Sequence, residues 1–86
     1  MLDPKYLEEV GDQVATIVKS EREKLGCSMS SVAERAGLSQ PMVSLVERGL
    51  RQPTVETLIR ICFALNLDAA DVLARAQRAA ARRKIK

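Results

Sequence analysis

Residues 31–49 read SVAERAGLSQPMVSLVERG, and this stretch decides the fold. Small and apolar residues recur in it at helical spacing, in two short runs separated by Gly37. Two helices this short cannot bury their apolar sides against each other alone, so both must pack against other helices while one side of the second stays exposed. Ala33 is small where two helix axes approach closely, and Gly37 permits the left-handed backbone of a sharp turn. The pattern predicts a helix-turn-helix at about residues 29–48.

The rest of the chain supplies the helices against which this pair packs. Apolar residues at intervals of three and four, with no strand-like alternation, predict an all-α domain of five helices. Asp3 followed by Pro4 marks the start of the first helix. Candidate N-caps of the later helices are Ser28, Ser39, Thr54 and Asp68. The expected helices span residues 4–25, 29–36, 40–48, 55–65 and 69–80.

The length of 86 residues allows one small domain with a modest core, which we place at residues 1–80. The basic end, residues 81–86, has no packing pattern and is expected to fray. In the fourth helix, the residues expected to face the core are Val55, Leu58, Ile59, Cys62 and Leu65.

Charge is distributed unevenly along the chain. Residues 1–26 carry four Lys/Arg and six Asp/Glu, whereas residues 54–86 carry seven and three. A partner with negative charge is therefore expected at the basic second half.

The side chains that most enzymes and metal sites need are scarce. Histidine is absent, and the two cysteines, Cys27 and Cys62, lack CxxC spacing. We interpret both as small core residues in a reducing compartment, with a disulfide between them as the alternative. No nucleophile–base pair or phosphate-binding glycine loop is present either, so we expect no enzymatic activity, cofactor or metal. The lack of a long apolar run or a signal peptide predicts a cytoplasmic protein without a membrane partner.

Several spaced motifs make the chain similar to one family. Arg22 near the end of the first expected helix is followed in order by "VAERAGLS", "VSLVERG", Pro53 and "LIRICFALNL". Over about residues 14–73 these motifs resemble the XRE family, the helix-turn-helix proteins of the Cro and lambda-repressor type. The resemblance implies a five-helix lambda-repressor-like domain that binds double-stranded DNA. The chain departs from the family at Met29, where a glutamine is usual, and at Pro41, a base-facing position that is commonly polar.

The resemblance implies that the helix at 40–48 lies in the major groove with its N-terminal part toward the base edges. The base-reading candidates are Gln40, Pro41, Ser44 and Leu45. Gln40 can bond adenine through its amide, and its alternative role is that of a solvated first-turn residue. Leu45 alternatively packs against another subunit or is simply exposed. The phosphate candidates are Ser28, Ser39, Arg48 and Arg51, with solvated surface charge as the alternative for the arginines.

The family also pairs an arginine of the first helix with the glutamate that ends the recognition helix. Here the resemblance implies an ion pair between Arg22 and Glu47. Desolvation offsets much of the attraction in such a pair, so we interpret its role as holding the recognition helix in register.

A single recognition helix reads few base pairs and neutralises few phosphates. We therefore expect a homodimer that places two such helices about 34 Å apart on duplex DNA. The candidate dimer interface, on and just before the last helix, consists of Leu65, Leu67, Val72, Leu73 and Ala76. The alternative is that this helix folds back on its own core, and Tyr6 is a second candidate contact.

These observations predict a compact, sequence-specific transcriptional regulator of the repressor or controller type, located in the cytoplasm at the nucleoid. One alternative is a DNA-binding antitoxin with a toxin as its protein partner, although the short basic end is a poor arm for wrapping a toxin. Another is a helical interaction module without DNA binding, which Met29 and Pro41 leave open. The basic end either attracts DNA nonspecifically or is only solvated.

Overall fold

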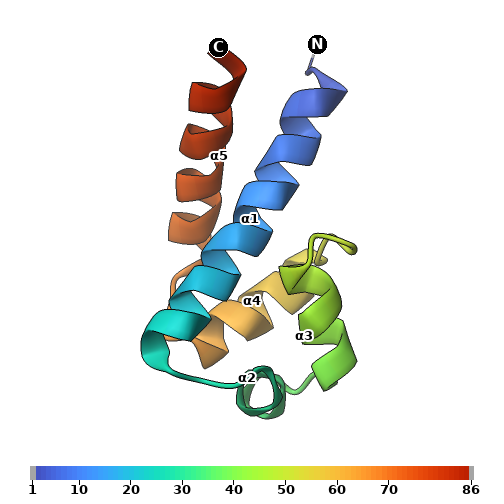
Figure 1. Ribbon diagram of the computed structural model, residues 1–86, viewed down its shortest axis with the longest axis vertical. Helices are drawn as coiled ribbons and strands as arrows, with labels where there is room; N and C mark the ends of the chain where they lie inside the picture. Colours follow the sequence, from blue (N-terminus) through green and yellow to red (C-terminus); the bar gives the residue numbers. More distant parts are fainter. Residues whose placement is uncertain (1, 86) are drawn as a thin grey trace.

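Five helices make up the part of the chain that the structure describes. The structure is a computed structural model that covers residues 2–85, with the side chains of residues 2–83. The helices are α1 (Pro4–Leu25), α2 (Met29–Ala36), α3 (Gln40–Glu47), α4 (Val55–Ala64) and α5 (Ala69–Ile85) (Figure 1). Residues 2–85 contain no strand, and the predicted all-α fold is confirmed. Among these residues no helix has both the length and the apolar character needed to cross a membrane.

The starts and ends of the short helices follow from their cap residues. The Ser28 hydroxyl accepts the Ser31 N–H at 3.0 Å, which satisfies an amide that the first turn of α2 would leave unpaired. The Ser39 and Thr54 hydroxyls do the same for α3 and α4. Gly37 ends α2 with a φ of 72°, a left-handed conformation that a residue with a Cβ adopts only with strain.

The fifth helix is longer than the sequence suggests. We expected it to end near residue 80 and the basic end to fray, but α5 continues to Ile85. Ala80 is fully buried, and Arg83 forms an ion pair with Glu9 of α1 at 3.2 Å, so this part of the helix packs against α1. The alanine and arginine residues of this segment are also strong helix formers. Lys86 of the expected basic end lies outside the described residues.

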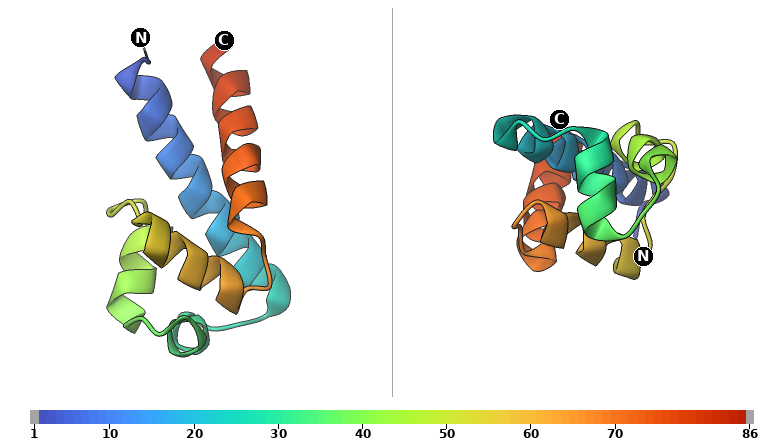
Figure 2. Two further views of the ribbon diagram at one scale, coloured as in Figure 1. Left: turned by 180° about the vertical axis from the view of Figure 1, so that it is seen from behind. Right: turned by 90° about the horizontal axis from the view of Figure 1, so that it is seen from below.

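The helices divide the molecule into two parts. α1 and α5 run antiparallel and side by side, so that both chain ends lie at one end of the molecule (Figures 1 and 2). The short helices gather at the other end, with α2 at the tip and α3 on the side away from α5 (Figure 1). Seen from behind, α4 crosses in front of α1 (Figure 2). This arrangement leaves an outer side of both α3 and α4 uncovered by other helices.

One core joins all five helices. Each helix contributes at least one side chain that is at most 1% exposed: Val18, Val32, Val43, Ile61 and Val72. The two-turn helices of the helix-turn-helix therefore bury their apolar sides against α1 and α4, as their length requires.

Two residues of α4 that we expected in the core lie on its outer side. Val55 and Ile59, which we expected to face the core, are 76% and 53% exposed. The core side of α4 consists instead of Leu58, Ile61 and Cys62, together with Leu65 just after the helix. Apolar residues lie on both sides of α4, so helical spacing alone does not show which side is inside.

The expected dimer interface is also wrong for three of its five residues. Leu65 is 2% exposed and Val72 and Ala76 are fully buried, because the start of α5 folds back on the core of its own chain. Leu67 is half-buried against that core. Leu73, at 41% exposure, is the member of the set that remains available to a partner.

Candidate nucleic-acid interface

The outer side of α3 brings the four base-reading candidates together. Val43 and Val46 hold the inner side of this helix in the core. Gln40 and Pro41 are exposed in its first turn, and Ser44, one turn later, is partly exposed. Leu45 is also partly exposed. The helix therefore presents an amide, a hydroxyl and apolar surface to the outside at its N-terminal half.

Pro41 shapes the start of α3. Proline is tolerated in a first helical turn because the N–H it lacks would have no helical partner there. The Met42 N–H is satisfied by the Ser39 hydroxyl at 3.2 Å, and the Val43 N–H by the Ser39 carbonyl at 3.3 Å. The Gln40 N–H is thus the one first-turn amide of α3 without a partner in the described part of the chain. An incoming phosphate would find fewer backbone donors here than at a helix start without proline.

Two arginines at the end of α3 have no carboxylate partner among the described residues. Arg48 caps the helix and Arg51 lies in the loop that follows, and both are exposed. Neither forms an ion pair with any described side chain, whereas Arg60, Arg75 and Arg83 each do. Arg48 and Arg51 therefore keep their full charge available to an anion beside α3.

The Arg22–Glu47 ion pair that the resemblance implies is present. Arg22 Nε lies 2.7 Å from Glu47 Oε2, and Nη2 lies 3.0 Å from Oε1. The third guanidinium nitrogen, Nη1, donates to the Cys27 carbonyl at 2.8 Å. The two side chains are 13% and 4% exposed. The arginine thus connects α1, the loop before α2 and the last residue of α3, which fixes how α3 sits on the domain.

The same contact sets the charge state of the pair. The hydrogen bond to Glu47 raises the pKa of the Arg22 guanidinium above its ordinary value, against the opposing effect of burial. Arginine therefore stays charged here at any ordinary pH, and the pair acts as a permanent structural link.

A family model matches the part of the chain that forms this site. The model, described as helix-turn-helix (HTH_3), matches residues 18–72, from the second half of α1 into α5. The chain belongs to the HTH_3 helix-turn-helix family. This is a family of DNA-binding transcriptional regulators, and the resemblance to the XRE type is confirmed.

Curated relatives of this HTH_3 protein are named as regulators. An uncharacterized HTH-type transcriptional regulator of Mycobacterium tuberculosis is 43% identical over 61 residues, which cover 71% of this chain and 44% of the relative. The HTH-type transcriptional regulator SutR of Escherichia coli is 36% identical over 61 residues, 71% of this chain and 34% of SutR. The match thus spans less than half the length of these relatives.

Solved structures agree with this fold. The clp gene regulator ClgR from Corynebacterium glutamicum superposes with a TM-score of 0.78 at 28% identity, covering 88% of this chain and 81% of that one. An HTH_3 family transcriptional regulator from Vibrio cholerae gives a TM-score of 0.74 at 28% identity, with 84% and 40% covered.

Two contacts that the sequence does not predict support the interface of this HTH_3 domain. The side chain of Gln52, in the loop after α3, lies over Gly11 of α1, where an added Cβ would be 2.4 Å from Gln52 Nε2. At the last residue of α2, just before the turn to α3, the Ala36 carbonyl accepts a hydrogen bond from Arg60 Nη1 of α4 at 3.2 Å. A glycine inside a helical pattern costs about 1 kcal/mol relative to alanine, and this cost was the available signal for the close approach at Gly11. The Arg60 contact has no local signal in the sequence.

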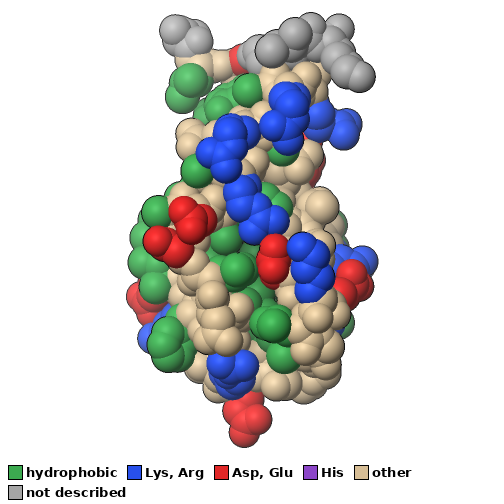
Figure 3. Space-filling view, turned by 90° about the vertical axis from the view of Figure 1, so that its left-hand side faces the viewer, with side chains coloured by type: hydrophobic (Ala, Val, Ile, Leu, Met, Phe, Trp, Pro, Cys, Tyr) green, Lys and Arg blue, Asp and Glu red, His purple; other side chains and the backbone are tan. Residues whose placement is uncertain are grey.

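The basic residues of α5 lie on a different side of the domain. Figure 3 shows the side of the molecule that faces away from α3, where Lys and Arg side chains follow one another along its length. Arg75, Arg78 and Arg82 line one shallow hollow between α5 and α1, together with Gln13 and Ile17. Arg75 is bound to Glu21 of α1 at 3.1 Å. These basic side chains of α5 therefore lie beside α1, whereas α3 lies on the side of the domain away from α5 (Figure 1).

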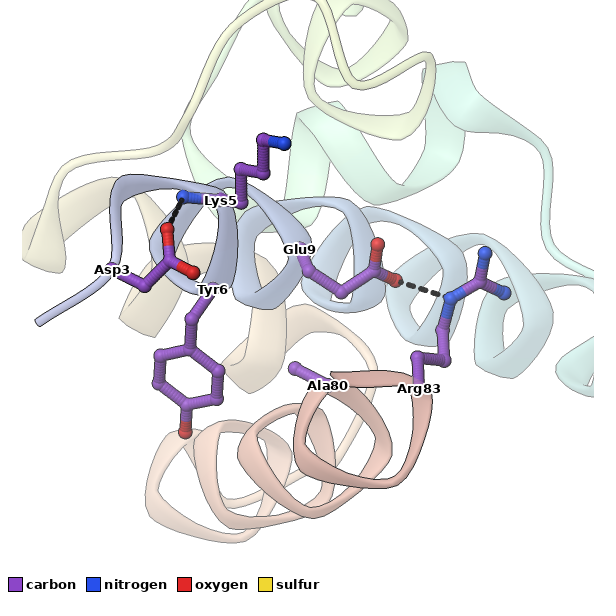
Figure 4. Close-up of a pocket in the computed structure, with 6 residues that line it drawn as sticks. All are labelled: Asp3, Lys5, Tyr6, Glu9, Ala80 and Arg83. Atoms are coloured by element: carbon purple, nitrogen blue, oxygen red, sulfur yellow. Dashed lines mark hydrogen bonds and ion pairs between the residues drawn. The ribbon is translucent and has the colours of Figure 1, made fainter. Parts of the chain in front are cut away.

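A second hollow lies between the ends of α1 and α5. Tyr6 reaches from α1 across α5, and Glu9 forms its ion pair with Arg83 beside Ala80 (Figure 4). The remaining lining residues are Asp3 and Lys5. No group of three His, Cys, Asp or Glu side chains in the described part of the chain is arranged to hold a metal ion. These contacts join the two helices and give no sign of a chemical site.

Proposed function

We propose that this HTH_3 protein is a sequence-specific transcriptional regulator that inserts α3 into the major groove of duplex DNA. The observation that carries the proposal is the outer side of α3, which is exposed at Gln40 and held in a fixed orientation by the buried Arg22–Glu47 pair. A rigid, outward helix of this kind is what major-groove docking requires. The names of the relatives as transcriptional regulators support the same conclusion. We favour a compact repressor or controller, acting at the nucleoid in the cytoplasm.

The four base-reading residues would contact bases in two ways, through hydrogen bonds and through apolar surface. The Gln40 amide can accept from adenine N6 and donate to adenine N7 at the same time, which makes it the strongest direct reader. Ser44 is short and can bond several bases. Pro41 and Leu45 offer apolar surface that suits the thymine methyl group.

The phosphate contacts lie around this helix. Arg48 and Arg51, which have no carboxylate partner among the described side chains, would neutralise phosphates that flank the groove. The Ser39 and Ser28 hydroxyl oxygens accept backbone N–H groups, and their hydroxyl hydrogens remain able to donate to phosphate oxygens. Two such domains in a homodimer would double these contacts and read two half-sites about 34 Å apart.

Binding to random duplex DNA at increasing salt concentration tests the proposal first. Because phosphate neutralisation releases counterions, we expect the logarithm of the affinity to fall linearly with the logarithm of the salt concentration. Selection of bound sites from a random DNA pool should then enrich a site with two-fold symmetry. Absence of binding to any duplex at low salt would exclude DNA recognition and favour the helical interaction module.

A further inference from the structure

An apolar ridge on the outside of α4 contains none of the residues of the proposed DNA interface. Val55, Ile59 and Phe63 follow one another at intervals of four residues and are 76%, 53% and 71% exposed. Residues four apart lie along one side of a helix, so the three side chains form a continuous row, called here the α4 ridge. This row lies beside the core side of α4, and no other helix in the described part of the chain covers it. Three large exposed apolar side chains in one row indicate a contact surface.

We propose that a second copy of this chain docks on the α4 ridge, with the two α4 helices antiparallel about a two-fold axis that passes near Ile59. The proposal gives a surface to the homodimer of the proposed function, and it rests on that dimer. It replaces the surface on α5 that the sequence suggested, because Leu65, Val72 and Ala76 are buried within their own chain.

The spacing of the ridge makes it complementary to itself. Rows of residues four apart are the ridges that most commonly interdigitate when two helices pack. In a two-fold contact, each residue on one copy meets the equivalent position across the axis. With Ile59 at the axis, the smaller Val55 faces the larger Phe63 of the partner subunit at each end. A shallow hollow beside Phe63, lined by Cys62, Leu67 and Ala70 among others, offers space for the partner's Val55.

The charges beside the ridge are complementary in the same arrangement. Glu56 and Arg60 lie on one flank of α4, where Glu56 Oε2 and Arg60 Nε of the same chain form an ion pair at 3.1 Å with side chains 76% and 46% exposed. At 1.5 Å per residue, Glu56 lies about 4.5 Å before Ile59 along the helix axis and Arg60 about 1.5 Å after it. After the two-fold rotation, the flanks of both α4 helices face the same side of the dimer. The order of Glu56 and Arg60 along the helix axis is then reversed in the partner. The partner's Arg60 then lies within about 3 Å of Glu56 along the axis, so each carboxylate would lie between the guanidinium of its own chain and that of the partner, and the two ion pairs would join in one cluster of four charges.

The extent of the ridge sets the expected strength of the dimer. Three apolar side chains and one pair of exposed charges per copy offer less than the roughly 800 Å² per partner of a standard stable interface. We therefore expect a reversible dimer with a dissociation constant in the micromolar range or weaker in the absence of DNA.

Sedimentation equilibrium of the full chain without DNA tests the inference through the residue at the axis. Ile59→Lys and Ile59→Glu should each make the protein monomeric, because two like charges would meet at the axis. An equimolar mixture of the two variants should associate again, since lysine and glutamate then face each other. Circular dichroism of each variant should show the wild-type helix content, because Ile59 is 53% exposed.

Two control variants locate the surface. Leu2→Lys changes a residue that is 65% exposed at the far end of α1 and should leave the dimer unchanged. Leu73→Lys changes the exposed residue of the α5 surface and should also leave it unchanged. A wild-type protein that is monomeric at all concentrations, or a dimer that Leu73→Lys abolishes and Ile59→Lys does not, would overturn the inference. A protein that dimerises through Ile59 without binding any duplex would contradict the proposed function and leave this inference standing.

Discussion

At the scale of single residues, the Arg22–Glu47 pair is the contact on which the position of α3 depends. Removing one partner of a buried pair leaves the other charge unpaired, which typically costs about 3–5 kcal/mol. We expect Arg22→Ala to lower the free energy of unfolding by about this amount, because Glu47 is 8% exposed and the Cys27 carbonyl also loses a donor. Urea denaturation of the variant measures the loss.

The double variant Arg22→Met with Glu47→Leu is the control for this prediction. Replacing a buried ion pair by apolar residues of similar size is often neutral for stability, so most of the lost free energy should return. Affinity for DNA should not return with it if the pair serves to orient α3. A double variant as unstable as Arg22→Ala would show that burial of an unpaired charge is not the cause.

The thiol of Cys62 should make the stability of the folded protein depend on pH in the alkaline range. Burial, with a smaller effect of the Asp68 carboxylate, raises the pKa of this thiol from 9.0 to about 11. Between these values the unfolded chain loses the proton and the folded chain keeps it, so stability falls as pH rises through this window. Two pKa units correspond to about 2–3 kcal/mol. Urea denaturation between pH 8 and 11 should therefore show a steeper loss for the wild type than for Cys62→Ala, and parallel curves would refute the assignment.

At the scale of elements, the turn between α2 and α3 depends on Gly37. Gly26 and Gly37 have nearly equal φ values of 70° and 72°, so alanine at either position should cost about 1–2 kcal/mol through left-handed strain. A Cβ at Gly37 would also lie 2.9 Å from Arg60 Nη1, whereas one at Gly26 would meet nothing within 4 Å. Gly37→Ala should therefore destabilise the protein by about 1 kcal/mol more than Gly26→Ala, the loss of one hydrogen bond. Equal losses in thermal denaturation would show that Arg60 moves aside freely.

The sequence predicts where the helices begin better than it predicts which side of each helix is buried. Helix starts at Ser28 and Ser39 could be predicted because capping depends on residues within three positions of each other. The outer side of α4 could not be predicted, because Val55 and Ile59 are as apolar as Leu58 and only the packing of distant helices decides which side is buried. The burial of Val72 in the core of its own chain could not be predicted for the same reason.

The candidate site was predictable as far as it is local. The grouping of Gln40 and Ser44 on one side of α3 follows from helical spacing alone. The pairing of Arg22 with Glu47, 25 residues apart, came from the resemblance, because no spacing rule joins residues on different helices. The contact of Arg60 with the turn after α2 came from the structure alone.

At the scale of the whole molecule, the recognition helix and the basic side chains of α5 lie on different sides of the domain. α3, with Arg48 and Arg51 at its end, faces one side, and the basic side chains of α5 lie on the other (Figures 1 and 3). If α3 binds the duplex, arginines on the two sides should contribute differently to DNA affinity although their charge is the same. This difference in contribution would distinguish binding through a docked α3 from nonspecific electrostatic attraction between a basic protein and DNA.

Three alanine variants measure this difference in one DNA-binding experiment. Gln40→Ala should relax the preference at one base position by about 1–3 kcal/mol, because it removes a bidentate contact to a base. Arg51→Ala should weaken binding to all sequences alike and reduce the slope of log affinity against log salt by about 1, because one phosphate contact is lost. Arg78→Ala removes an equal charge on the far side and should change neither quantity. If Arg78→Ala reduces the slope as much as Arg51→Ala does, the duplex is not docked at α3 and the orientation argued from the buried pair is wrong.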